Sequence, residues 1–324
     1  MSGDRGGSGD PFAPGTTHAG WTVTSLLQAG ARPRYVVEQG DRSAMLTAFP
    51  LEGPSGALHR ALAERLARCQ AVAHEALERV DAGVVEGAAF VVLPPLERLG
   101  EEALDAKAAL EHAARLARAL GALHGRGLVH GEVDAWSVVK RPDGKLGLLP
   151  PGLRGPPPGL DTLGLGADPR FAAPEVLDGR PATPASDVFA LGLVLARFVA
   201  GQVLVGAADP VDAIAARGRA PVPALAAVAK QRQLPAAVLA LHEVLCAYAP
   251  EERPQDGEAA ARMIEEAARG RAPQRPARSF ARVQAVGIGG PLVLLTLFGA
   301  AVGALVHLLT TRYPLVDPLA GVGF

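Results

Sequence analysis

The sequence lacks an excess of either charge, because 32 Lys and Arg residues are matched by 33 Asp and Glu residues. Nucleic-acid-binding domains usually carry a basic excess, so this balance predicts no nucleic-acid partner. Only two cysteines are present, Cys69 and Cys246, and they lie too far apart in sequence to form a metal-ligand motif. We therefore expect no metal site and two reduced thiols, buried in a cytosolic domain.

The chain also lacks an apolar run at its start. Residues 1–20 are rich in Gly, Ser, Pro and Asp, which predicts a flexible tail rather than a signal peptide. Over the whole chain 49% of the residues are hydrophobic and 20% are charged, a balance typical of a globular, core-forming protein. A chain of 324 residues is long enough for one large domain or two small ones.

Charged residues are absent from one long stretch, residues 283–311. A helix of about 20 apolar residues crosses the hydrocarbon core of a bilayer, so this stretch predicts a transmembrane helix. Within it, Gly299 and Gly303 form a weak small-xxx-small match through which two helices could pack as a homodimer.

The flanks of this stretch predict its orientation. Arg312 is the only cationic side chain after it, whereas five arginines precede it: Arg269, Arg271, Arg275, Arg278 and Arg282. Cationic flanks stay in the cytoplasm. We therefore expect a single-pass protein of the inner (plasma) membrane. A Pro/Arg-rich linker over residues 270–282 would precede the helix. The extracytoplasmic tail, residues 312–324, would be too short to fold as a sensor domain.

Two regions of different pattern lie between the tail and the linker. Residues 21–98 contain strand-like runs over 21–30, 34–39, 43–49, 77–85 and 88–96, and one helix over 57–71 with Leu58, Leu62, Leu66 and Cys69 at helical spacing. Residues 99–269 are mostly helical, with helices predicted over 103–124, 186–200, 210–217, 222–229, 234–247 and 256–269. Short runs over 128–133, 137–142 and 145–150 follow the first of these helices.

Three charged residues of the helical region have complementary chemistry. Glu175 closes the triplet Ala-Pro-Glu, and a buried carboxylate needs a partner such as Arg253, which can donate two parallel hydrogen bonds. Asp187 is predicted to be the N-cap of a helix, where its oxygens accept backbone N–H bonds.

These residues, in this order, resemble the Hanks-type serine/threonine protein kinases of bacteria. The resemblance covers about residues 20–270 and is specific within 110–200. It implies an α+β, two-lobed protein-kinase-like fold, with a small β-rich lobe and a larger helical lobe. It also implies that Glu175 belongs to the APE motif, that Asp187 holds the catalytic-loop backbone, and that His130 is the structural histidine of that loop.

The positions that hold the nucleotide depart from the family pattern. Thr47 occupies the place of the lysine that binds phosphates, and Glu64, the best candidate for its glutamate partner, is left without a lysine. The Gly-rich cover loop keeps only Gly30, and the run Arg32-Pro33-Arg34 would crowd backbone approach to phosphates.

The catalytic loop departs as well. Gly131 replaces an arginine, and Glu132 occupies the place of the catalytic base with one methylene too many. Asp134 stands where these kinases carry a lysine against the γ-phosphate, and Ser137 replaces the asparagine that binds Mg²⁺.

The metal-binding DFG motif is also degenerate. Pro150 replaces the aspartate and Pro151 the phenylalanine, so that only Gly152 remains. Because the lysine and both Mg²⁺ ligands are missing together, we expect a pseudokinase with no bound cofactor, acting as a scaffold or regulatory module that recruits an unidentified cytoplasmic protein.

Two enzymatic alternatives remain open. A divergent active kinase would use Glu132 as base and Lys140 or Arg34 for phosphate, and ATP with Mg²⁺ would then be its cofactors. A small-molecule phosphotransferase is disfavoured by Glu175, Asp187 and Pro150. Thr162 is the only hydroxyl between Pro150 and Glu175 and the predicted site of phosphorylation by a partner kinase.

Overall fold

The computed structural model of the chain describes residues 10–30, 32–93, 97–98, 100, 102–153, 168–204 and 225–274. Residues 1–277 form one compact unit, with hydrophobic clusters of its own, and every described residue belongs to it. No helix within these described ranges is long and apolar enough to cross a membrane. The predicted transmembrane stretch 283–311, the predicted helix 210–217 and Thr162 all lie outside the described residues.

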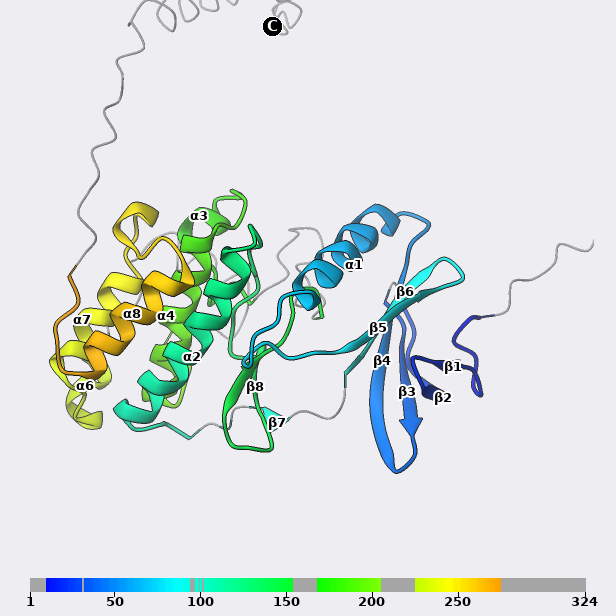
Figure 1. The fold of residues 1–324 in the computed structure, drawn as a ribbon, viewed down its shortest axis with the longest axis horizontal. Coiled ribbons are helices and arrows are strands. Elements are labelled where there is room, and N and C mark those ends of the chain that lie inside the picture. Colours follow the sequence, from blue (N-terminus) through cyan, green and yellow to red (C-terminus); the bar gives the residue numbers. More distant parts are fainter. Residues whose placement is uncertain are drawn as a thin grey trace, which may run out of the picture. The chain divides into compact units, whose positions relative to one another are not determined.

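An antiparallel sheet forms the N-terminal lobe, with strand order β1-β2-β3-β4-β6-β5 (Figure 1). Its strands are β1 (Thr17–His18), β2 (Trp21–Gln28), β3 (Arg34–Gln39), β4 (Arg42–Pro50), β5 (Asp81–Val85) and β6 (Ala88–Leu93). Alternation explains the start of β2, where Trp21 and Val23 are buried and the threonines that follow each of them are exposed. The predicted strands are confirmed, with β5 shorter than expected.

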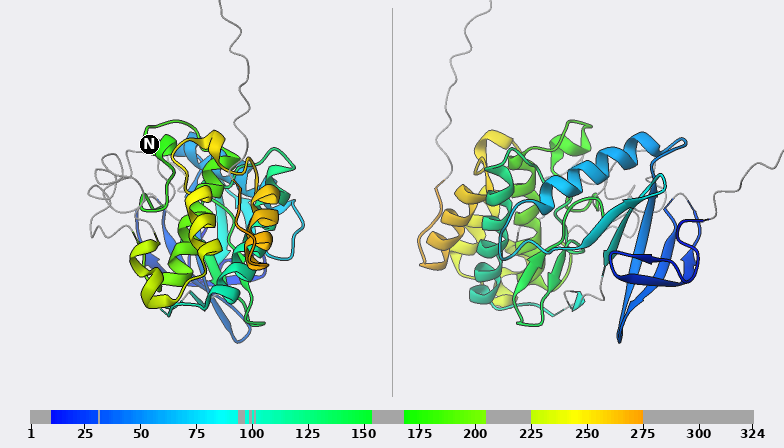
Figure 2. Two further views of the ribbon diagram at one scale, coloured as in Figure 1. Left: turned by 90° about the vertical axis from the view of Figure 1, so that its left-hand side faces the viewer. Right: turned by 45° about the vertical axis from the view of Figure 1, so that its right-hand side comes forward.

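Residues 10–20 differ from the flexible tail that the composition predicts for residues 1–20. The Phe12 side chain is 2% exposed and belongs to a hydrophobic cluster with Trp21, Tyr35 and Phe90. Figure 2 shows this segment, in dark blue, folded beside the sheet, where β1 pairs with β2. One large apolar side chain and an unpaired strand edge are enough to hold a Gly- and Pro-rich segment in place.

Helix α1 (Gly56–Gln70) packs on β4 and β6. It lies alongside the β5–β6 hairpin in both Figure 1 and Figure 2. Its buried residues include His59, Leu66 and Cys69, whereas Leu58, expected on the buried face, is 54% exposed. The predicted face is thus confirmed at Leu66 and Cys69, and His59 takes the buried place expected of Leu58, with its Nδ1 2.7 Å from the carbonyl oxygen of Pro50, the last residue of β4.

Helices make up most of the second lobe (Figure 1). They are α2 (Ala106–His124), α3 (Pro174–Leu177), α4 (Pro184–Ala200), α6 (Ala226–Arg232), α7 (Ala236–Leu245), the short 3-10 helix η1 (Pro250–Glu252) and α8 (Gly257–Ala268). Asp105, Thr183 and Asp256 cap α2, α4 and α8 through their side-chain oxygens, which explains where these helices begin. Helix α4 is buried along almost its whole length and forms the centre of the lobe.

A small sheet of β7 (Glu97–Arg98), β8 (Val138–Lys140) and β9 (Leu146–Leu148) lies beside α2. Because β7 pairs with β8, it belongs to the second lobe, although the sequence pattern places residues up to 98 in the first. The run 128–133 forms no strand. It belongs to the irregular segment between α2 and β8 that carries His130, Glu132 and Asp134.

Candidate functional site

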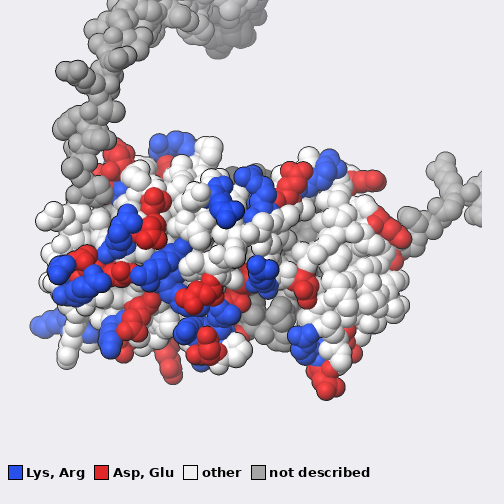
Figure 3. Space-filling view, in the orientation of Figure 1, with Lys and Arg blue, Asp and Glu red and all other residues white. Residues whose placement is uncertain are grey.

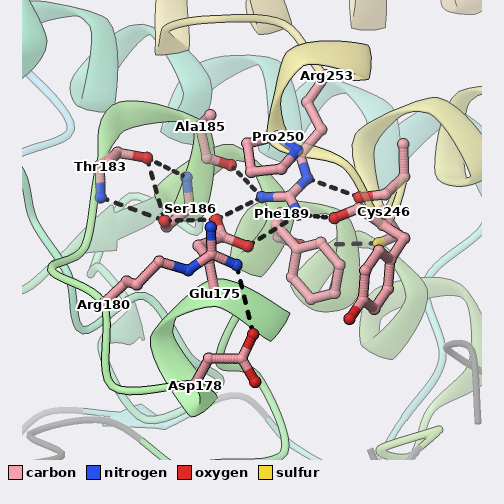
Figure 4. A network of polar contacts seen from close by, with 12 residues as sticks. Glu175, Asp178, Arg180, Thr183, Ala185, Ser186, Phe189, Cys246, Pro250 and Arg253 are labelled. Carbon is pink, nitrogen blue, oxygen red and sulfur yellow. Dashed lines mark hydrogen bonds and ion pairs between the residues drawn. The ribbon is translucent and has the colours of Figure 1, made fainter. Parts of the chain in front are cut away.

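A buried ion pair joins α3 to the end of η1. Arg253 donates from Nη1 to Glu175 Oε1 at 2.7 Å and from Nη2 to Glu175 Oε2 at 3.0 Å. The predicted bidentate pair is thus present (Figure 4). Ser186 Oγ donates to the same Glu175 oxygen at 2.7 Å, and the guanidinium lies over the Phe189 ring at 4.7 Å from its centroid.

Arg253 has no accessible surface, and its remaining donors are also used. It donates to the carbonyl oxygens of Ala247, Ala185 and Tyr248 at 2.7, 3.2 and 2.7 Å. Burial by itself raises the pKa of the Glu175 carboxyl, but the hydrogen bonds from Arg253 and Ser186 outweigh it and lower that pKa. The carboxylate is therefore ionised and fully engaged in structural contacts.

Asp187 connects α4 to the loop that carries His130. Its carboxylate accepts the backbone N–H groups of His130 at 2.7 Å and Gly131 at 2.6 Å, and it also contacts His124 Nε2 at 3.0 Å. The prediction that Asp187 is an N-cap is wrong. Thr183 caps α4, and Asp187 projects from the first turn toward another segment of the chain.

Two histidines align this loop, and their tautomers follow from their partners. His130 Nδ1 accepts the N–H of Glu132 at 3.2 Å, so its Nε2 donates to Leu149 O at 2.8 Å. In the same way His124 Nδ1 accepts the N–H of Gly257, at the start of α8, and its Nε2 donates to Asp187. The His130 ring thus links the loop to Leu149 just after β9, and the His124 ring links α2 to α4 and α8.

Glu132, at the predicted base position, is held by contacts within the protein. Its Oε2 accepts the N–H of Gly152 at 2.7 Å, and its Oε1 lies 3.5 Å from Nη1 of Arg65 in α1. Arg65 also donates to the carbonyl oxygen of His130. Burial raises the pKa of the Glu132 carboxyl, and Arg65 opposes that shift only in part.

Gly131 makes room for this arginine. Its φ of 70° is in the left-handed region, and a Cβ at Gly131 would lie 3.0 Å from Arg65 Nη2. Gly131 is the position at which the kinase resemblance predicts an arginine, and here a guanidinium from α1 approaches the same loop from the other lobe. Arg65 and Glu132 form a brace between the two lobes.

Hydrogen bonds between Asp134 and Ser137 hold residues 134–137 in a tight turn. Asp134 Oδ1 accepts the N–H groups of Trp136 and Ser137 at 2.8 and 2.7 Å. The Ser137 hydroxyl accepts the Asp134 N–H and donates to the Asp134 carbonyl oxygen, both at 2.9 Å. The Asp134 carboxylate, predicted to repel phosphate, is 1% exposed and bonds the loop backbone instead.

A cavity of about 130 Å³ remains in front of this loop, lined by residues of both lobes: Arg34, Met45, Leu93, Glu132, Asp134, Trp136, Ser137, Leu149, Pro150 and Leu153. Small-molecule sites usually enclose about 300–1,000 Å³. Thr47 is 4% exposed, and within the described part of the chain its hydroxyl oxygen has no hydrogen-bond partner. Pro150 contributes only a buried ring to the cavity wall.

The remaining candidate residues lie as follows. Gly152 has a φ of 84° and donates its N–H to Glu132, which explains a glycine there. Gly30 is exposed, and a Cβ added there would meet no heavy atom of the described residues within 4 Å. Glu64 is exposed on α1, away from the loop that the neighbouring Arg65 contacts.

Comparison with curated proteins finds bacterial kinases. The chain is 32% identical over 211 residues to the serine/threonine-protein kinase PknK of Mycobacterium bovis and of Mycobacterium tuberculosis, a match that covers 61% of this chain and 19% of the relative. It is 28% identical over 222 residues to the serine/threonine-protein kinase PkaA of Streptomyces coelicolor, covering 63% of this chain and 40% of the relative. The chain is a distant relative of bacterial serine/threonine protein kinases. It spans less than half the length of these relatives, and a scan against protein-family models finds no match.

As a relative of these kinases, the chain can be compared with what phosphoryl transfer needs. Mg·ATP requires a lysine on the strand of Thr47 and oxygen or amide ligands at the positions of Ser137 and Pro150. The side chains present do not fit, because Thr47 is uncharged, the Ser137 hydroxyl is occupied, and proline has no ligand atom. Of the alternative cations, Lys140 pairs with Glu97 at 2.8 Å, whereas Arg34 lines the cavity with Glu132.

Arg65 and His124 were missed by sequence reasoning. His124 is the last residue of the predicted helix 103–124, which is a signal for a capping role but names no partner. Arg65 is adjacent to Glu64, the candidate partner of the missing lysine, and its role follows only from the orientation of α1 over the loop.

Proposed function

We propose that the chain is a pseudokinase that acts as a scaffold or regulatory binding module. The observation that carries the proposal is the state of the side chains at the catalytic positions. Glu132, Asp134 and Ser137 are bonded to the protein itself, Thr47 supplies no positive charge, and the Pro150 side chain supplies no ligand atom. No cofactor is expected, since a triphosphate would enter a site without the cations that offset its charge.

The brace between the lobes supports this proposal. In active kinases ATP and its metal ions contribute to holding the lobes together. Here Arg65 of α1 contacts Glu132 and the His130 carbonyl oxygen directly. A kinase-like fold with its own interlobe contact can present a fixed surface to a partner without binding a nucleotide.

The place of action is part of the same proposal. The apolar stretch 283–311 and the arginines before it support an anchor in the inner (plasma) membrane, with the kinase-like domain on the cytoplasmic face. Pairing through Gly299 and Gly303 and phosphorylation of Thr162 belong to it as well. In the view of Figure 3 basic and acidic side chains are interspersed, which is consistent with a protein partner rather than nucleic acid. A phosphatase fused after Phe324 tests the orientation, because it would be active only outside the cytoplasm.

Thermal denaturation tests whether the protein binds ATP together with a metal ion, as an active kinase must. Residues 1–277 are titrated with millimolar ATP, with and without Mg²⁺ or Mn²⁺. We expect no metal-dependent change in melting temperature, whereas a ligand at a hundred times its Kd would add about 2.7 kcal/mol to the free energy of unfolding. A stabilisation that requires the metal would overturn the proposal.

An active but divergent kinase is the second candidate. It is favoured by the cavity that Arg34 and Glu132 share, since a cation and a carboxylate are the minimum for binding phosphate and accepting a proton. It requires autophosphorylation that the Glu132→Gln variant abolishes. Equal phosphate incorporation by wild type and variant would reject it.

A further inference from the structure

A second and larger cavity is lined by α1 and the N-terminal sheet. It encloses about 440 Å³ between α1 and the strands β4, β5 and β6. All but three of its lining residues are apolar, with Leu62, Ala63 and Leu66 on the helix side and Phe49, Ala89 and Val91 on the sheet side. The cavity opens to solvent beside Val84, which is 67% exposed, and its volume is within the range of small-molecule sites.

The polar lining residues are Gln70, Arg79 and Asp81, and two of them are already engaged. Trp21 Nε1 donates to Asp81 Oδ2 at 2.8 Å, and Gln70 Nε2 donates to the Val80 carbonyl oxygen at 3.3 Å. Arg79 is exposed and forms no ion pair with another described residue. Its guanidinium is therefore the charge available to a ligand that enters the apolar space.

We propose that this cavity binds an amphiphile with one apolar chain and an anionic head group, the chemistry of a medium-chain fatty acid. The chain would lie between α1 and the sheet, and the carboxylate would bond Arg79. A methylene group is of similar size to a water, which takes about 30 Å³ of the liquid, so about 15 such groups fill 440 Å³.

The site is continuous with the brace between the lobes. Pro151 and Gly152 line its inner end, and the N–H of Gly152 bonds Glu132. The helix that forms one wall also carries Arg65, which contacts the same carboxylate. A ligand in this cavity would thus contact both α1 and the segment at Gly152, the two elements that hold Glu132. Binding could therefore regulate the position of α1 relative to the loop that carries Glu132. The proposal does not depend on whether the protein is a kinase or a pseudokinase.

The direct test is a titration of residues 1–277 with decanoate, decanol and decylammonium below their micelle concentrations. We expect decanoate to raise the melting temperature by at least about 3 °C at saturation, and the alcohol and the ammonium to raise it less. No binding of decanoate, or tighter binding of decylammonium, would overturn the proposal.

Variants locate the site. Ala63→Phe fills the cavity and should weaken decanoate binding at least tenfold, whereas Ala61→Phe, on the exposed side of the same helix, should leave it unchanged. Ala67→Phe, at an exposed position of the lining, is a second filling variant in case the first does not fold. Arg79→Glu should abolish the preference for the carboxylate. Wild-type affinity in both filling variants would refute the assignment.

Discussion

Replacing Arg253 with methionine removes the partner of a buried carboxylate. The change keeps an unbranched side chain but deletes the two bonds to Glu175 and three bonds to backbone carbonyl oxygens. Breaking a buried ion pair by removing one partner typically costs about 3–5 kcal/mol, because the other charge stays buried. The contact with Phe189 is lost as well and contributes about 2 kcal/mol when desolvated, although such terms do not add fully.

We therefore expect Arg253→Met to lower the free energy of unfolding of residues 1–277 by about 4–5 kcal/mol, a large part of a typical total of about 5–15 kcal/mol. Urea denaturation followed by far-ultraviolet circular dichroism measures this loss. The double variant Glu175→Leu with Arg253→Met is the control, and it should be more stable than Arg253→Met alone because no carboxylate is left unpaired. A loss below about 1 kcal/mol, or a double variant that is less stable than the single one, would refute the reasoning.

The other predictions concern the charged groups of the same lobe. The pKa of the Glu132 carboxyl is raised in the folded protein, so at pH values between its usual pKa and the raised one the native state holds a proton that the unfolded chain has lost. The free energy of unfolding therefore falls as pH rises through this range. Glu132→Gln should remove the corresponding fall in melting temperature. The pKa of the Glu175 carboxyl is lowered, so its contribution to the free energy of unfolding is complete above the usual carboxyl pKa and is lost as pH falls through the lowered pKa of the folded state. Glu175→Gln should therefore cost more stability at neutral pH than in acid. Asp187→Asn presents an amide to the N–H groups of His130 and Gly131 and should cost about 3 kcal/mol, with faster hydrogen exchange at those two amides than elsewhere in the lobe.

Much of the architecture could be predicted because it depends on local patterns. The alternation of apolar and polar residues in β2 to β4 and the helical spacing of apolar residues in α2, α4 and α8 depend only on residues close together in the sequence. The structure contains these elements close to the expected bounds. The pairing of Glu175 with Arg253 could be expected as well, because a buried carboxylate has few satisfactory partners.

Contacts between distant segments could not be predicted in the same way. Residues 10–20 pack on the sheet because the Phe12 ring contacts the rings of His18, Tyr35 and Phe90 from three strands, which composition does not reveal. Asp187 bonds the loop backbone rather than its own helix, since that loop passes the first turn of α4. Asp134 has the sign that would repel phosphate, but its carboxylate bonds the turn that Ser137 closes.

The sequence by itself determined which chemical groups the chain possesses at each kinase-like position. The prediction that Thr47 stands at the lysine position, and Ser137 and Pro150 at the metal-ligand positions, requires no structure, since threonine carries no positive charge and the proline side chain has no ligand atom. Only the tertiary structure decided which groups meet. It brought Arg65 of one lobe to Glu132 of the other and opened an apolar cavity behind α1, because both depend on the position of a helix relative to residues remote in sequence.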